Sequence, residues 1–289
     1  MKDELASLIK TNRPKISDSS VKTYTSLLHT LYKKLDGEDG IDFFKNEKNK
    51  ILEHIDNIQS NQSKKTLLSA LYILTNEETY HKNMIKYANE VNNHYKSQKH
   101  DPERLKNLPA LEELKEQYNI YKNNLKKSPS IENYIDYFIV AVSSTALMPP
   151  RRALDWTEMR LSGEINKKTD NYIDGKYFVF NKFKTAKFKD DEEKRVLIPD
   201  ELKKMINKFK KISDNDYLIY NHNTGKKLNS SQFTKMLNGI YGKKVGVDVI
   251  RSVYLSDLYK GLPKLQELEQ IADDMGHTVS SALNYYVKK

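Results

Sequence analysis

The sequence predicts a mainly α-helical protein with a small β-sheet, folded as two domains. Its 289 residues exceed the roughly 100 to 200 residues of a typical single domain. Apolar residues recur at spacings of three and four through most of the chain, which indicates amphipathic helices. One segment breaks that pattern, because two short apolar runs enclose a long lysine-rich stretch. That arrangement is typical of a β-hairpin with a basic tip.

The first domain is predicted at residues 1–100 and is all-helical. Residues 17–37 begin with Ser and Asp as candidate N-caps, carry an apolar stripe and end at a glycine. Two further stripes, at 67–74 and 80–95, repeat Leu, Tyr, Met and Val at helical spacing. Residues 101–109 then lose the apolar period and contain two prolines, so they are predicted to form a linker.

The second domain is predicted at residues 110–289. Helices are expected near 111–121 and 131–142, where the apolar face widens and deep burial is predicted. The runs 177–180 and 195–198 are predicted to pair as the hairpin. Further elements follow from apolar spacing: a strand at 217–220 and helices near 230–241, 249–260, 264–274 and 278–287.

The composition excludes several kinds of site. The chain has no cysteine, which rules out disulfides, thiolate nucleophiles and thiolate zinc sites. No stretch approaches 18 uninterrupted apolar residues and the N-terminus has no signal-like apolar region, so we expect an intracellular protein with no membrane partner. The formal net charge of +10 suits a polyanion, although a lysine-rich composition alone would also produce it.

Four separated segments carry the residues with chemical potential: PPRRALDW at 149–156, FKTAKF at 183–188, DVIRSVYLSDLY at 248–259 and MGHTVSSALNYY at 275–286. Singly, each has a plain structural explanation, such as an exposed ion pair between Arg152 and Asp155. In this order and spacing, the set resembles the tyrosine recombinase (phage integrase) family over about residues 106–289. Pro149 and Pro150 are similar to variants from large eukaryotic DNA viruses and mobile elements.

The resemblance implies a set of catalytic residues. The family presents an Arg with an acid three positions later, a hairpin Lys, a second Arg, a Gly-His box, and a Tyr nine residues after that His. These motifs fall on Arg152, Lys184, Arg251, His277 and Tyr286, with Asp155 as the acid and Tyr285 as a neighbour of the nucleophile. The hairpin tip also carries lysines expected to contact DNA, namely Lys182, Lys187 and Lys189.

The implied reaction cuts and rejoins double-stranded DNA without a metal, ATP or another cofactor. A Tyr hydroxyl attacks the phosphodiester, giving a 3'-phosphotyrosine and a free 5'-hydroxyl. Two guanidiniums grip the phosphate oxygens in place of a metal, His adds a donor, and Lys protonates the departing oxygen. The resemblance further implies a C-shaped clamp, made of a helical core-binding domain and a catalytic domain, and a homotetramer on two DNA sites.

The sequence departs from the family at Asp248, where His or Lys usually lies three positions before the second Arg. An ionised carboxylate cannot donate to phosphate and would repel it. Asp248 is therefore expected to cap the helix that carries Arg251, the favoured interpretation, or to orient Arg251 by accepting its N–H groups. In the second case, Asp248→Asn should impair cleavage sharply.

Two other functions stay open at this level. A type IB topoisomerase shares the Tyr, the Arg pair and the catalytic fold, but it usually has Lys at the position of Asp248 and a β-rich cap. A DNA-binding protein of the same fold that has lost activity is the other, and Asp248 is its best support. The DNA target, the direction of the reaction, the host compartment, and cleavage in cis or in trans are not decided by the residues.

Overall fold

The structure is a computed structural model, and it describes residues 1–98, 105–183, 194–275 and 278–281. The chain forms two compact units: the first contains 1–99 together with 263–289, and the second contains 100–262. Each unit has its own apolar core. The segment from 263 onward, which the sequence places in the second domain, is thus grouped with the first unit. The functional domain limits and the clamp stay predictions.

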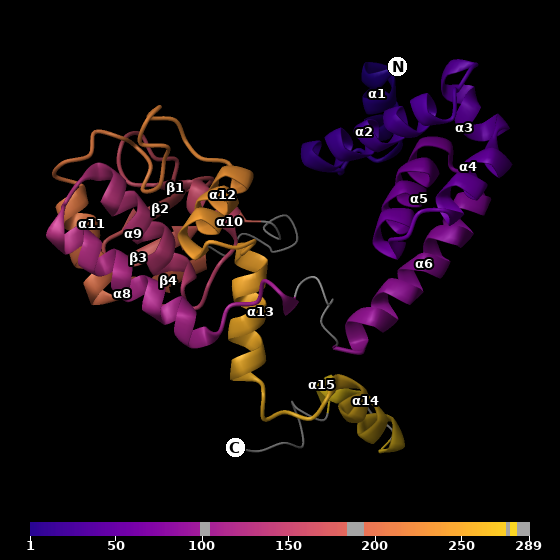
Figure 1. Cartoon of the computed structure of the whole chain (residues 1–289). Coiled ribbons are helices and arrows are strands. Elements are labelled where there is room, and N and C mark those ends of the chain that lie inside the picture. Colours follow the sequence, from indigo (N-terminus) through magenta and orange to yellow (C-terminus); the bar gives the residue numbers. More distant parts are fainter. Residues whose placement is uncertain (99–104, 184–193, 276–277, 282–289) are drawn as a thin grey trace. The chain divides into compact units, whose positions relative to one another are not determined.

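The first unit is helical throughout the residues described. Its elements are α1 (Lys2–Asn12), α2 (Asp18–Lys34), η1 (Gly40–Asp42), α3 (Phe43–Asn46), α4 (Lys48–Asp56), α5 (Asn61–Thr75), α6 (Glu78–Lys96), α14 (Leu265–Asp274) and α15 (Val279–Ser281) (Figure 1). The predicted helices in 17–37, 67–74 and 80–95 are confirmed. At the start of α2, Ser17 accepts a hydrogen bond from the Ser20 amide, as expected for an N-cap.

The second unit packs helices around a four-stranded sheet (Figure 1). Its elements are α8 (Leu111–Lys127), α9 (Ile131–Ser143), α10 (Ala153–Thr157), β1 (Met159–Arg160), β2 (Asn171–Asp174), β3 (Tyr177–Phe180), β4 (Lys194–Leu197), α11 (Asp200–Phe209), α12 (Ser230–Tyr241) and α13 (Val247–Leu258). The strand order is β1-β2-β3-β4, with β1 and β2 parallel and the other pairs antiparallel. The β3–β4 hairpin and the buried helix α9 are confirmed, as is the mainly helical fold class.

The predicted strand at 217–220 is wrong. Tyr217 forms an isolated β-bridge to Arg160, and Tyr220 forms another to Lys227. Neither bridge continues into a ladder of paired residues, so 217–220 is not a strand. The cause is local, since Asn215 Oδ1 accepts a hydrogen bond from the Tyr217 amide and holds this segment in a turn. β1 and β2, which the apolar pattern did not predict, complete the sheet instead.

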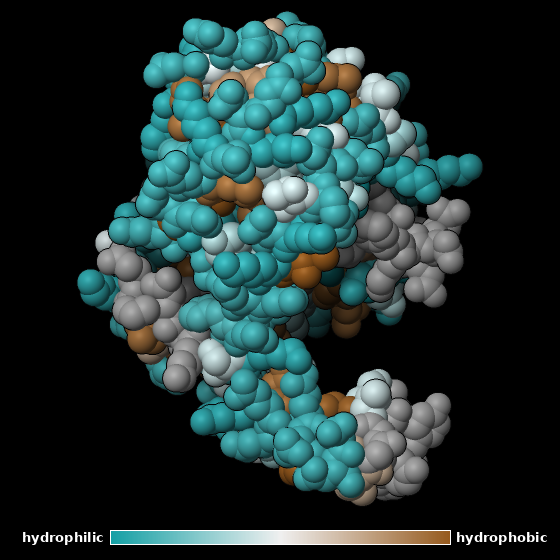
Figure 2. All heavy atoms as spheres, turned by 90° about the vertical axis from the view of Figure 1, so that its right-hand side faces the viewer, coloured by the Kyte–Doolittle hydropathy of each residue, from teal (hydrophilic) through white to brown (hydrophobic). Residues whose placement is uncertain are grey.

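The surface of the described residues is mostly polar. Figure 2 shows a face on which hydrophilic residues predominate and hydrophobic ones occur in small separate groups. Across the described ranges, no helix combines the length and the apolar character needed to span a bilayer.

Candidate active site

Two prolines lead the chain into α10. The run 149–150 fixes φ at both positions and favours extended backbone before each proline, so no helix forms there. Arg152 has extended backbone and occupies the N-cap position of α10. Behind it, Trp156 packs edge-on against Phe178 and Phe180 of β3, with ring centroids 5.1 and 5.4 Å apart. This packing fixes α10, and the arginines at its start, against the sheet.

Arg151 and Asp155 form a buried ion pair at the start of α10. Arg151 Nη2 lies 2.9 Å from Asp155 Oδ2, and the side chains are 17% and 4% exposed. The guanidinium also stacks on Phe180, 3.9 Å from the ring centroid. The sequence pattern assigns Asp155 to Arg152, but the structure joins it to Arg151, because stacking on Phe180 holds that guanidinium beside the carboxylate.

Burial shifts the pKa of both members of this pair. Desolvation raises the pKa of Asp155 above its ordinary value, against the opposing attraction of Arg151, Arg152 and Arg251. Desolvation likewise lowers the pKa of Arg151, against the stabilising charge of Asp155. Asp155 Oδ1 is buried and has no hydrogen-bond partner within the described part of the chain.

Arg251 reaches the same region from α13. The structure corrects the favoured role of Asp248, since Gly246 is the N-cap of α13, without a side-chain cap, and Asp248 lies inside the first turn. There its carboxylate suits the positive end of the helix dipole without capping it. Arg251 Nη1 lies 3.4 Å from Asp248 Oδ1, and the side chains are 30% and 86% exposed. The contact matches the alternative orienting role, but an ion pair this exposed contributes little energy.

A pocket of about 280 Å³ brings these residues together. Its lining consists of Pro149, Pro150, Arg151, Arg152, Asp155, Phe183, Lys194 and Arg251. Within the described chain, four cationic side chains thus surround one carboxylate. The Arg152 carbonyl accepts a hydrogen bond from the Asp155 amide, but its side chain makes no hydrogen bond or ion pair with another described residue, so the guanidinium has its donors available. Planar guanidiniums converging on one small site are suited to binding a phosphate group.

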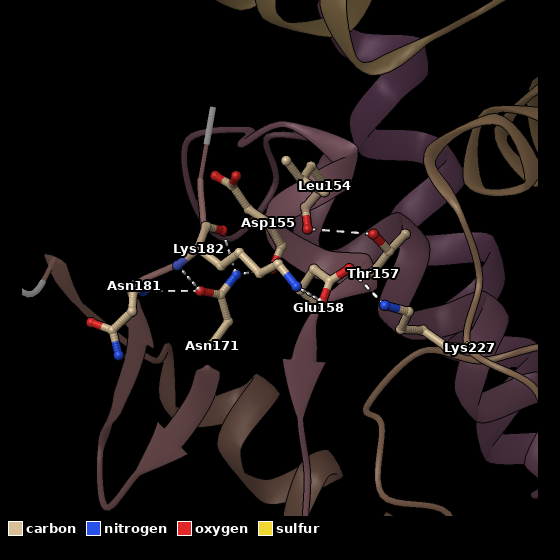
Figure 3. Close-up of polar contacts among 8 residues, drawn as sticks. All are labelled: Leu154, Asp155, Thr157, Glu158, Asn171, Asn181, Lys182 and Lys227. Atoms are coloured by element: carbon tan, nitrogen blue, oxygen red, sulfur yellow. Dashed lines mark hydrogen bonds and ion pairs between the residues drawn. The ribbon is translucent and has the colours of Figure 1, made fainter. Parts of the chain in front are cut away.

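Glu158, at the C-terminal end of α10, binds one lysine at the base of the hairpin and a second from the segment before α12. Lys182 Nζ and Lys227 Nζ bind the two carboxylate oxygens of Glu158 at 3.0 and 2.7 Å (Figure 3). Burial alone would raise the pKa of Glu158, but these hydrogen bonds hold it below its usual value. Lys182, predicted to contact DNA, is thus paired here, with its side chain 56% exposed.

The structure brings together part of the predicted set. Arg152, Asp155 and Arg251 line one pocket. Lys182 and Asp248 are described and do not line this pocket. The remaining predicted residues, Lys184, Lys187, Lys189, His277, Tyr285 and Tyr286, lie outside the described residues. Arg151, Phe183 and Lys194 line the pocket and were not predicted. The spacing of four between Arg151 and Asp155 was the available signal, because it is as favourable for an ion pair as a spacing of three.

The described residues contain no cluster of three or more His, Asp or Glu side chains arranged to hold a metal. No protein-family model matches the chain, and neither does a curated protein sequence. The chain is similar to the crystal structure of XerA recombinase, with 15% sequence identity and a TM-score of 0.32, over 100% of this chain and 94% of that one. A TM-score this low does not establish a shared fold or function.

Proposed function

We propose that this protein is a tyrosine-type site-specific recombinase that cuts and rejoins double-stranded DNA. One observation carries the proposal: Arg152 and Arg251, 99 positions apart and chosen from sequence motifs, line the same pocket. Had the two guanidiniums lain on opposite faces, they could not have gripped one phosphate. Arg151 and Lys194 add positive charge at the same place, which stabilises a phosphate whose charge grows during attack.

In the proposed reaction, the Tyr286 oxygen bonds to the scissile phosphorus while the bond from phosphorus to the 5'-oxygen breaks. The Tyr286 proton is released to water, and Lys184 supplies a proton to the leaving 5'-oxygen. Arg152 and Arg251 neutralise the non-bridging oxygens, and His277 donates to the same group. The 3'-phosphotyrosine preserves the phosphoester, so rejoining by another 5'-hydroxyl needs neither ATP nor a metal.

The decisive experiment is covalent trapping on a nicked suicide substrate, whose short cleaved strand diffuses away. The wild-type chain should become covalently attached to DNA, and Tyr286→Phe should abolish that product. Tyr285→Phe is the matched control and should retain it. Loss of the adduct in Tyr285→Phe with retention in Tyr286→Phe would move the nucleophile to Tyr285, and no adduct in the wild-type chain would refute the proposal.

The two alternatives predict different outcomes. An inactive DNA-binding protein would bind duplex DNA and form no adduct; its main support was a repulsive carboxylate at Asp248, which is 86% exposed and is not part of the pocket lining. A type IB topoisomerase would form the adduct and would relax supercoiled plasmid without a preferred sequence. The recombinase instead requires a specific site.

Binding to DNA should depend strongly on salt. Each neutralised phosphate should contribute roughly −0.9 to the slope of log affinity against log salt concentration. A flat response would argue against a nucleic acid partner.

We further propose a homotetramer on two DNA sites. Mixing Tyr286→Phe with Arg152→Ala tests the geometry of cleavage: restored activity means action in trans, and none means action in cis. A source in viruses or mobile elements stays a prediction.

A further inference from the structure

Asn171, the first residue of β2, lies between α10 and the start of the hairpin tip (Figure 3). Its side chain is fully buried. Asn171 Nδ2 donates to the backbone carbonyls of Asp155, at 3.0 Å, and Lys182, at 2.9 Å. Its Oδ1 accepts from the backbone amides of Asn181, at 2.9 Å, and Lys182, at 2.7 Å. All the hydrogen-bonding capacity of this side chain is used on main-chain groups.

These four bonds connect two walls of the pocket. Asp155 lines the pocket from α10, and Phe183, the residue after Lys182, lines it from the hairpin. A buried amide with every donor and acceptor satisfied holds its partners in one arrangement, because any shift leaves a buried polar group unpaired. The second tie between these elements, Lys182 to Glu158, is more exposed, since the Lys182 side chain is 56% exposed, and constrains the main chain less.

We propose that Asn171 is a positioning residue, which fixes the chain at Lys182 and Phe183 against α10 and so keeps Phe183 in the lining of the pocket. The inference rests on the proposed function, in which Lys184, next along the chain, protonates the leaving 5'-oxygen. Asn171 itself touches no reacting atom. Its loss should therefore impair proton delivery more than phosphate binding by the arginines.

The test compares two nicked substrates that differ at one bridging atom. In the ordinary substrate, the 5'-oxygen leaves and requires a proton. With sulfur at that position, the Tyr286 oxygen still bonds to phosphorus, the phosphorus–sulfur bond breaks, and sulfur leaves with the electron pair as a thiolate. Because a thiol has a pKa of about 8.5, far below that of an alcohol, the thiolate leaves without an acid.

Asn171→Ala should slow cleavage of the oxygen substrate about 10- to 100-fold, a partial loss of the roughly 100- to 10,000-fold that general acid catalysis contributes. The sulfur substrate should be cleaved within about threefold of wild type, because it needs no acid. Asn215→Ala is the matched control: it also loses bonds to main-chain groups, at Gly225 and Tyr217, but away from the pocket. Equal slowing of both substrates by Asn171→Ala would overturn the proposal.

Thermal unfolding is measured first, and Asn171→Ser, which keeps one donor and acceptor, replaces Asn171→Ala if the alanine variant does not fold. If wild type cleaves neither substrate, the proposed function fails, and hydrogen exchange decides the positioning role separately. The Asn181 and Lys182 amides should then exchange at least about tenfold faster in the Asn171 variant than in wild type or Asn215→Ala, since they lose their acceptor. Unchanged exchange at these two amides would reject the role.

Discussion

The N-terminal ends of α10 and α13 each carry an arginine paired with a nearby aspartate, yet the two ion pairs differ in how deeply they are buried. Asp155 is 4% exposed and pairs with Arg151 at 2.9 Å, next to an aromatic ring. Asp248 is 86% exposed and pairs with Arg251 at 3.4 Å. Their spacing in the sequence, four and three residues, is almost the same. The difference between the buried pair and the surface pair is therefore one of burial, and the spacing of the two residues in the sequence does not predict how deeply a pair is buried.

The largest effect should follow removal of the buried acid. Asp155→Ala leaves Arg151 buried without its counter-ion, which should lower the free energy of unfolding by about 3–5 kcal/mol. Asp248→Ala is the matched control at the exposed pair and should change it by less than about 0.5 kcal/mol. Denaturant unfolding measures both. Similar losses in the two variants would contradict the contrast drawn from burial.

For the rate of DNA cleavage, the arginine before α10 and the arginine in α13 should be equally important. Arg152→Ala and Arg251→Ala should each reduce the rate of covalent adduct formation about 100-fold or more, because each removes a donor to the charge of the transition state. Arg195→Ala is the control, since Arg195 pairs with Asp174 and is not part of the pocket lining. Single-turnover cleavage rates on the suicide substrate measure the effect. If either pocket variant cleaved like wild type, that arginine would have no place in the phosphate site.

Glu158 provides an intermediate case, since its side chain is 15% exposed and binds two lysines. Its pKa is held below the ordinary 4.5, so its ionised form stabilises the folded state above that pH. Glu158→Gln should therefore cost about 1 kcal/mol of unfolding free energy at pH 7. The difference should disappear as the pH falls through the folded-state pKa, below 4.5. A difference that did not decrease as the pH fell below 4.5 would show that it does not come from ionisation.

The smallest effect should come from Asp248→Asn. Because the carboxylate is 86% exposed, unfolding free energy should change by less than about 0.5 kcal/mol and the cleavage rate by less than about threefold. The same unfolding and single-turnover measurements apply. A sharp loss of cleavage without a loss of stability would instead support the orienting role for Arg251 and would reduce the contrast between the two regions.

Helices with a clear apolar stripe could be predicted from the sequence, as α2, α9 and α12 show, and so could the hairpin strands. The short strand at 171–174 was missed because it contains only two apolar residues, although it pairs with the adjacent β3 across the turn at 175–176. The shared pocket of Arg152 and Arg251 was implied by the family resemblance. Spacing allowed either Arg151 or Arg152 as the partner of Asp155, and it could not decide between them, because Phe180, which positions Arg151, approaches only in the folded chain.

The two consecutive prolines at the rim of the pocket have one more consequence. Neither offers a main-chain N–H, so these positions supply no fixed dipole to a bound oxyanion. An oxyanion next to these prolines would then be bound by long, fully charged side chains, and its binding would depend on ionic attraction more than on shape. In the proposed recombinase, such a site would tolerate any nucleotide sequence around the phosphate, and the target would have to be chosen elsewhere on the protein.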